Sequence, residues 1–357
     1  MDATLEKFSD AIRQAGESRP LRLRGGGTKD FYGQALEGEI VDTRAYSGVV
    51  SYEPSELVIT ARCGTRLAEI EAAMRERGQM LAFEPPHFAQ FGSGAATLGG
   101  AVAAGLSGPG RQAAGALRDF VLGVKIMDGR GKALSFGGQV MKNVAGYDVS
   151  RLMAGSLGTL GIVLEASLKA LPLPVAEATL RLELPEDRAI EQLNRWGGKP
   201  LPISASAWNY GTLAIRLSGA AAAVKGACAR IGGERVQDAE AQRFWNGVRE
   251  HTDRFFKNEA PLWRVSVPST TPPLGLQGEQ TIEWGGALRW IFSHADARTV
   301  RETAKRAGGH ATLFRGGDKS VGVFQPLAPA LMKIHKDLKR EFDPHGILNR
   351  GRMYPDF

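Results

Sequence analysis

The sequence predicts an α+β protein built of two domains. Its 357 residues suffice for two hydrophobic cores, and 43% hydrophobic with 23% charged residues is ordinary for a globular protein. Short apolar strands alternate with amphipathic helices, and no GxGxxG follows any strand, which argues against a Rossmann domain. Two prolines at residues 171–174 interrupt the sheet. We expect domains at residues 1–174 and 175–325 and a C-terminal segment at 326–357.

Charge and cysteine content exclude several classes of protein. The formal charge of +7 is spread over mixed-sign segments, so the protein is not expected to bind nucleic acid. The basic and aromatic stretch at 243–257 contains Glu250 and Asp253 and is better explained as an amphipathic helix. Two distant cysteines, Cys63 and Cys228, exclude a disulfide scaffold, a cysteine zinc site and an iron–sulfur cluster on this chain alone.

We expect neither a secretory signal nor a membrane span in this chain. Its first residues are polar and include acidic side chains, unlike a secretory signal, and no apolar stretch approaches the length of a membrane span. We therefore expect a cytoplasmic protein, with any membrane association made through partner subunits.

The first domain opens with a helix and continues with short strands. Leu5, Phe8 and Ile12 recur at helical spacing and predict a helix over residues 4–14. Strands are expected at 20–23, 39–42, 49–52 and 57–61. A helix then begins at Thr65, with apolar residues on one face, and closes at Gly78.

A hairpin and an alternating strand complete this domain. A turn at residues 128–131 joins strands 120–127 and 133–136 into a β-hairpin. Asp148 can cap a short helix that runs through Met153. In the strand at 162–169, apolar residues at even positions alternate with Val163, Glu165, Ser167 and Lys169, which predicts that one face is buried.

The second domain contains all six tryptophans of the chain. Its expected strands lie at 178–183, 213–217, 264–267 and 281–284. Its expected helices lie at 186–196, 220–231, 239–256 and 295–307. A basic amphipathic helix at 326–340 then begins the C-terminal segment.

The most informative stretch is residues 91–110, of which seven are glycine and most of the others are small. Such a backbone can approach another group closely and offer N–H groups to a phosphate. Tight helix packing on small residues is the alternative, whereas Leu98, Val102 and Leu106 argue against a flexible linker.

Two further glycine clusters support a phosphate-bearing ligand. The first, residues 24–33, has three consecutive glycines flanked by Arg24 and Lys29, although a simple turn would also fit it. The second is Gly155-Ser-Leu-Gly-Thr-Leu-Gly161. Together the three clusters, each at the end of a strand or helix, predict a large cofactor that carries phosphate.

The order of these motifs resembles the FAD-binding fold shared by vanillyl-alcohol oxidase and p-cresol methylhydroxylase, the PCMH-type fold. The resemblance rests on Arg24 to Thr28, on Thr97 to Gly100 with Ser107 and Gly108, on Gly146-Tyr147-Asp148, on residues 155–162, and on the tail Asp343 to Asn349. Within that family the chain is most similar to the FAD-binding accessory subunits of bacterial three-subunit glycolate oxidases. The resemblance implies a two-lobed FAD domain, a smaller cap domain and a C-terminal tail that returns to the FAD domain.

The resemblance also implies a set of cofactor contacts. These are Arg24, Gly25, Gly26, Gly27, Thr28, Pro85, Pro86, Ala96, Thr97, Leu98, Gly99, Gly100, Ser107, Gly108, Gly158, Thr159, Gly161, Ile162 and Asn349. Backbone N–H groups of Gly25 to Thr28 and of Thr97 to Gly100 would hold the pyrophosphate, residues 158–162 the adenine end, and Pro85 and Pro86 would lie towards the flavin. Covalent attachment in the family uses a His near the first loop or a Cys in the second, and neither is present, so noncovalent FAD is expected.

The resemblance implies partners as well as a cofactor. A larger homologous FAD subunit would oxidise a small 2-hydroxyacid, glycolate, to glyoxylate, and an iron–sulfur subunit would take the electrons. Two other functions remain open: a self-sufficient hydroxyacid or alditol oxidoreductase, with His310 as base and Arg315, Lys319 and Arg289 for a carboxylate, and a scaffold that keeps FAD only structurally. His310 and Asp318 fall short of a metal site, and none is expected.

Overall fold

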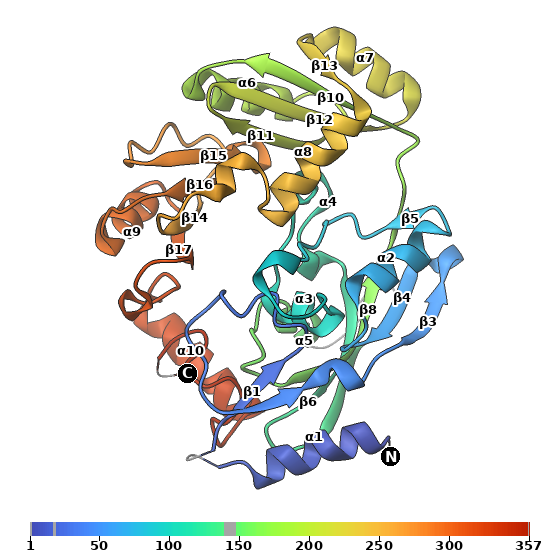
Figure 1. Ribbon diagram of the computed structural model, residues 1–357, viewed down its shortest axis with the longest axis vertical. Helices are drawn as coiled ribbons and strands as arrows, with labels where there is room; N and C mark the ends of the chain where they lie inside the picture. The colour runs from blue at the N-terminus through green and yellow to red at the C-terminus, as the bar shows by residue number, and fades with distance from the viewer. Residues whose placement is uncertain (1, 17–18, 139–147, 356) are drawn as a thin grey trace. The chain divides into compact units, whose positions relative to one another are not determined.

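The computed structural model describes residues 2–16, 19–138, 148–355 and 357. These form two compact units, drawn as a ribbon in Figure 1. Unit 1 comprises Met1–Leu106, Ala116–Pro172 and Pro326–Phe357, and unit 2 comprises Ser107–Gly115 and Leu173–Gln325. Both units mix helices with sheets, so the predicted α+β class is confirmed.

Residues 107–115 join unit 2, although the expected first domain ran without a break to residue 174. The reason is local bonding. Trp284 Nε1 donates to Gly108 O at 3.1 Å, and Ser206 Oγ donates to Gln112 Oε1 at 2.6 Å. The short helix α4 (Arg111–Ala114) therefore lies against the sheet of unit 2.

Unit 1 is built on a five-stranded antiparallel sheet in the order β3-β4-β8-β6-β7. The strands are β3 (Val49–Glu53), β4 (Val58–Arg62), β6 (Val121–Met127), β7 (Ala133–Gly137) and β8 (Ile162–Lys169). Two small sheets accompany it: β1 (Leu21–Arg24) runs parallel to β2 (Glu39–Asp42), and β5 (Gln79–Met80) pairs with β9 (Leu171–Pro172). The predicted hairpin of β6 and β7 is confirmed.

The helices of unit 1 are α1 (Ala3–Gln14), α2 (Leu67–Arg75), α3 (Leu98–Ala104), α5 (Val149–Met153) and α10 (Pro329–Phe342). Helix α3 is the middle of the central glycine-rich stretch and lies against β8. Its small residues therefore do serve helix packing, one of the two explanations that the sequence left open. The described part of the chain has no helix with the length and apolar character needed to cross a bilayer.

One face of strand β8 is buried, as its alternating pattern predicted, and the other face is buried in part. Ile162 and Leu164 pack in one core, as expected. On the opposite face Val163 is also buried, and Ser167 shares a hydrogen bond of 2.8 Å with Thr60. The opposite face is covered because α3 packs there, which the local sequence of the strand does not indicate.

The C-terminal segment is part of the core of unit 1. Ile347 and Leu348 are buried with Phe8 and Ile12 of α1. Leu21 N donates to Ile347 O at 2.8 Å, so the tail extends the small sheet that begins with β1. The end of the chain is thereby fixed beside its beginning.

Unit 2 contains an eight-stranded antiparallel sheet in the order β13-β10-β12-β11-β15-β16-β14-β17. Its strands are β10 (Ala176–Glu183), β11 (Ile203–Asn209), β12 (Thr212–Gly219), β13 (Glu234–Val236), β14 (Leu262–Ser266), β15 (Glu279–Glu283), β16 (Leu288–Phe292) and β17 (His310–Arg315). Its longer helices are α6 (Glu186–Gly197), α7 (Ala221–Ile231), α8 (Asp238–Glu250) and α9 (Ala297–Arg306). Strands β11, β13, β16 and β17 were not predicted. Strand β13 has three residues and all five residues of β16 are buried, so neither shows the alternation of a half-exposed strand.

Helix α8 ends at Glu250, earlier than the predicted end at residue 256. His251 adopts a left-handed conformation with φ 54° and terminates the helix. Its imidazole is buried, stacked on the Phe256 ring at a centroid distance of 3.8 Å and edge-on to Trp290 at 4.6 Å. Burial, with Arg315 and Arg264 nearby, lowers the pKa of His251 well below its ordinary value.

We predict that His251 makes unit 2 less stable in mild acid. The unfolded chain binds a proton at His251 below about pH 6.5, whereas the folded chain does not, so stability falls as pH falls, by up to about 1.4 kcal/mol per pH unit. Asparagine tolerates the left-handed backbone, so His251→Asn should lack this pH-dependent part of the stability while keeping the backbone conformation.

The measurement is urea unfolding at pH 7 and pH 5 followed by tryptophan fluorescence, since all six tryptophans belong to unit 2. The free-energy difference between wild type and variant should change by about 2 kcal/mol between these pH values. A difference independent of pH would contradict the prediction.

Candidate cofactor site

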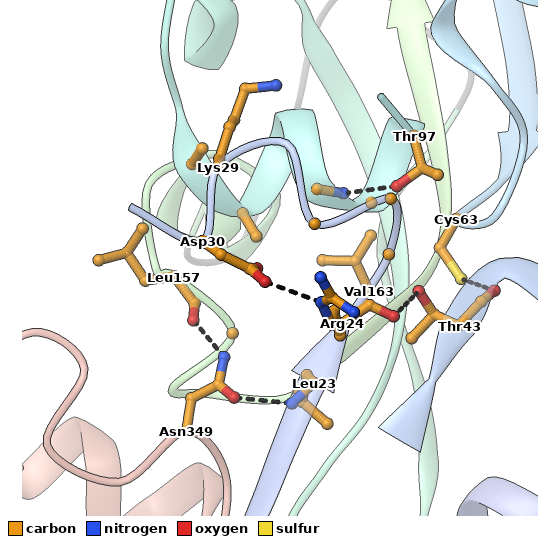
Figure 2. A pocket seen from close by; sticks show the side chains of 18 of the residues that line it. Leu23, Arg24, Lys29, Asp30, Thr43, Cys63, Thr97, Leu157, Val163 and Asn349 are labelled. Carbon is orange, nitrogen blue, oxygen red and sulfur yellow. Dashed lines mark hydrogen bonds and ion pairs between the residues drawn. The ribbon is translucent and has the colours of Figure 1, made fainter. Parts of the chain in front are cut away.

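A hollow in unit 1 gathers the three glycine clusters and the C-terminal tail. Its empty volume is about 820 Å³, which includes open solvent at its mouth. The loop after β1, the first turn of α3, the turn at residues 157–163 and the tail residue Asn349 all border it. Figure 2 shows side chains from these segments converging on the hollow.

Gly25 to Thr28 of the first glycine loop border the hollow, and we call their four backbone N–H groups the cradle. Among the described residues, none accepts a hydrogen bond from the N–H groups of Gly25 to Thr28. The loop also lies too close to its neighbours for side chains: a Cβ on Gly26 would stand 1.8 Å from Ala95 O, and one on Gly25 would stand 2.4 Å from Thr97 Oγ1. Successive N–H groups without protein acceptors are the arrangement that binds a phosphate.

The charged side chains at the hollow carry a positive balance. Within the described part of the chain, Arg24, Lys29 and Arg352 border it together with one carboxylate, Asp30, so these side chains carry a formal net charge of +2. Asp30 Oδ2 accepts from Arg24 Nε and from Arg22 Nη2, each at 2.8 Å. Figure 2 marks the bond between Arg24 and Asp30. The site therefore favours an anion of about two charges.

The second glycine loop contributes differently from the prediction. The N–H of Leu98 donates to Thr65 O at 2.9 Å, and that of Gly99 donates to Cys63 O at 2.8 Å. The N–H of Gly100 is 3.3 Å from Thr97 Oγ1, which caps α3. The N–H groups of Leu98, Gly99 and Gly100 thus already have acceptors within the protein, which argues against the prediction that they hold the pyrophosphate.

Glycines 99 and 100 have separate roles. A Cβ on Gly99 would stand 2.7 Å from Cys63 Cβ, so this glycine permits α3 to pack against the end of β4. A Cβ on Gly100 would meet one atom within 4 Å, Thr97 Oγ1 at 3.3 Å. Since Gly100 borders the hollow, the missing side chain at this position leaves room for a ligand.

The third cluster is tied to the tail by Asn349. Asn349 Nδ2 donates to Leu157 O at 2.6 Å, and its Oδ1 accepts from Leu23 N at 2.8 Å; both bonds are drawn in Figure 2. Gly158 must lack a side chain because a Cβ there would stand 2.7 Å from Asn349 Nδ2. One tail residue thus holds the end of β1 against the third glycine turn.

Twelve of the predicted cofactor contacts border the hollow. They are Arg24, Gly25, Gly26, Gly27, Thr28, Thr97, Gly99, Gly100, Gly158, Gly161, Ile162 and Asn349. The others do not border it. They are Pro85, Pro86, Ala96, Leu98, Ser107, Gly108 and Thr159.

Several of the residues away from the hollow have other places in the structure. Leu98 is buried in the core, and Ala96 O accepts the N–H of Leu67. Ser107 and Gly108 belong to unit 2. Thr159 O accepts from Lys339 Nζ at 2.7 Å. Of the motif at 146–148, Gly146 and Tyr147 lie outside the described residues, and Asp148 caps α5.

Several bordering residues were not predicted as contacts. Cys63 lies at the end of β4, and burial raises the pKa of its thiol to about 12, which makes it a poor nucleophile. Thr43, whose O is 3.8 Å from Cys63 Sγ, borders the hollow beside it. Arg352 comes from the tail. None of the three stands within a glycine cluster, so the motifs gave no signal for them.

The weak catalytic candidates of unit 2 do not converge. His310 and Arg315 stand at opposite ends of β17, roughly 16 Å apart at strand spacing. Arg289 is 0% exposed, donates to Thr271 O at 2.8 Å and lies 3.7 Å from Glu186 Oε1. Burial lowers the pKa of Arg289 to about 10. These residues do not form one site for a carboxylate and a base.

Fold and site together define a flavoprotein with an FAD-binding domain. Residues 3–137 match the family described as FAD binding domain. The chain also resembles solved alkyldihydroxyacetonephosphate synthase with a TM-score of 0.65 and 15% identity, over 97% of this chain and 74% of that one, which shows the shared fold. The expected FAD cofactor is confirmed.

The relatives narrow the class to a family. The chain is 47% identical to the glycolate oxidase subunit GlcE of Escherichia coli (strain K12), over 99% of this chain and 97% of that protein. It is 32% identical to the glycolate oxidase subunit GlcD of Bacillus subtilis (strain 168), over 49% of this chain and 37% of that protein. The chain belongs to the GlcE family of glycolate oxidase subunits.

The residues of the hollow fit FAD. The cradle of Gly25 to Thr28 offers N–H groups to a pyrophosphate, whose two negative charges match the local balance of +2. Apolar groups around it, including Leu23, Leu157 and Val163, can contact the rings on either side. The reduced nucleophilicity of Cys63 agrees with noncovalent binding.

We predict that Gly100→Ala weakens FAD binding about tenfold while the apoprotein stays folded. The added methyl group would enter the hollow, and alanine is favoured over glycine in a helix by about 1 kcal/mol, which offsets small packing losses. The measurement is FAD titration of the apoprotein by quenching of flavin fluorescence.

Gly226→Ala is the matched control, since it makes the same change in exposed α7, where a Cβ would meet nothing within 4 Å. It should leave FAD affinity unchanged. Equal affinities for the two variants would show that Gly100 does not face the cofactor.

Proposed function

We propose that this chain is the FAD-carrying subunit of a glycolate oxidase complex and takes part in the oxidation of glycolate to glyoxylate. It is an FAD-dependent oxidoreductase subunit. The observation that carries the proposal is the cradle of four N–H groups beside a net charge of +2, in a chain that aligns over nearly its full length with a glycolate oxidase subunit.

The residues of the chain bind and orient the cofactor in this proposal. Gly25 to Thr28 hold the pyrophosphate by backbone N–H groups, and Arg24 and Lys29 supply positive charge to it. Asn349 fixes the turn at Leu157 that borders the same hollow. FAD itself, when bound, supplies the ability to accept a hydride equivalent and to release electrons singly.

The electrons need a partner to receive them. The chain has two cysteines, fewer than the four that hold an iron–sulfur cluster. We propose that they pass to an iron–sulfur subunit and that a larger FAD subunit, homologous to this chain, binds glycolate. The similarity to GlcD, a longer protein than this chain, supports such a homologous pair. We place the complex in the cytoplasm, with membrane contact only through partners.

The geometry of unit 2 favours a complex in which another subunit binds and oxidises glycolate. A chain that oxidised a hydroxyacid alone would need a base near a carboxylate-binding cation. His310 and Arg315 are separated by the length of β17, and Arg289 is buried with Glu186. The isolated chain should therefore hold FAD that substrate does not reduce.

The test is the visible spectrum of the chain, alone and co-purified with its partner subunits, before and after anaerobic addition of glycolate. We expect flavin bands in both samples and bleaching only in the complex, with all flavin released by acid precipitation. Absence of flavin from the gently purified chain would contradict the cofactor assignment. Bleaching of the flavin bands in the isolated chain would show that it is a dehydrogenase by itself. Flavin bands that glycolate does not bleach even in the complex would favour a scaffold that keeps FAD only structurally.

A further inference from the structure

Arg352, five residues from the end of the chain, is inserted beneath the first glycine loop. Its guanidinium group is bonded to three backbone carbonyls of that loop: those of Lys29 at 3.2 Å, Asp30 at 3.0 Å, and Gln34. The main chains of the two segments are also bonded, because Gln34 N donates to Arg352 O at 2.9 Å. The two partners are more than three hundred residues apart in sequence.

The loop is shaped to receive this guanidinium. Gly33 has φ +88°, and a Cβ there would stand 2.9 Å from Arg352 Nε. Arg352 is 6% exposed, and burial lowers its pKa to about 10. Removing a guanidinium from water is costly, so the bonds to the loop must compensate for it.

The N–H groups of the cradle explain why a residue such as Arg352 is needed to hold the loop. Neighbouring N–H dipoles that point the same way repel one another when no anion is bound, and a glycine-rich segment has many other conformations available. Arg352 binds the carbonyl side of the loop just beyond the cradle, at Lys29 and Asp30. Because Lys29 and Asp30 directly follow Gly25 to Thr28, a contact at this point limits the conformations open to the segment that carries those N–H groups.

Two more residues of the C-terminal segment act on the third glycine turn. Asn349 donates to Leu157 O, and buried Lys339 donates to Thr159 O at 2.7 Å. Lys339 also bonds Asp343 Oδ2 and Leu348 O, each at 2.8 Å, so it is fixed within the segment itself. The segment therefore contacts the main chain on two sides of the hollow.

We propose that Arg352 is a positioning residue for the cofactor: it holds the first glycine loop in the conformation that binds the FAD pyrophosphate, and the C-terminal segment thereby sets FAD affinity. The inference rests on the proposed FAD site. Arg352 also borders the hollow, so its charge contributes to the balance there, but the positioning role depends on its planar fork, which reaches several carbonyls of the chain at once.

The test compares Arg352→Gln, Arg352→Lys and a control, Arg340→Gln, by FAD titration of each apoprotein. Arg340 is exposed on α10 and bonds Asp337 and Lys336 O within its own helix, so its loss removes a charge from the same segment without touching the loop. Circular dichroism and thermal unfolding of each apoprotein identify a temperature at which it is fully folded, and the titrations are made there. Under that condition a change in the dissociation constant for FAD does not arise from global unfolding.

We expect Arg352→Gln to weaken FAD binding at least thirtyfold and Arg352→Lys at least tenfold, with Arg340→Gln within twofold of wild type. Lysine keeps the charge but not the fork. Full affinity in Arg352→Lys would show that only the charge is sensed and would overturn the positioning role, as would affinity within threefold of wild type in Arg352→Gln. If Arg352→Gln does not fold, the lysine variant decides alone. Wild-type protein that binds no FAD would instead refute the proposed function.

Discussion

The structure depends on the contact of two backbones with no side chain between them. Gly26 lies against Ala95 O, and Gly92 lies against the Cα of Thr28, at distances that any Cβ would violate. This contact joins the loop after β1 to the chain that leads into α3. It thereby fixes these two segments, both of which border the hollow, relative to each other. The same absence of side chains exposes N–H groups, so the constraint that closes the fold also makes the anion site.

Charge follows from the same arrangement. Among the described residues that border the hollow, Asp30 is the single carboxylate, and two arginines share it. In our proposal a pyrophosphate balances the remaining positive charge and binds the N–H groups of Gly25 to Thr28. In this proposal FAD is part of the charge balance of unit 1. The protein contribution to redox chemistry is binding and orientation, while glycolate binding falls to the partner in our proposal.

Local patterns predicted much of this, and long-range contacts account for the rest. Most helices and strands of unit 1 follow from periodicity, and the first glycine loop was identified from Gly25 to Thr28 with its flanking cations. The pattern of β8 could not show that α3 covers Val163, and the motif at Leu98 and Gly99 could not show that Thr65 and Cys63 already accept their N–H groups. Cys63 and Arg352 reach the hollow only through tertiary folding, and no local signal marks them.

We propose that one glycine loop, not two, presents the N–H donors to the pyrophosphate. The most direct measurement is backbone hydrogen exchange with and without FAD, read at residues 25–28 and at 98–99. Because the N–H groups of Leu98 and Gly99 are bonded within the protein, FAD should slow exchange strongly at 25–28 and change it little at 98–99. Protection confined to 98–99, with none at 25–28, would contradict the assignment of the cradle.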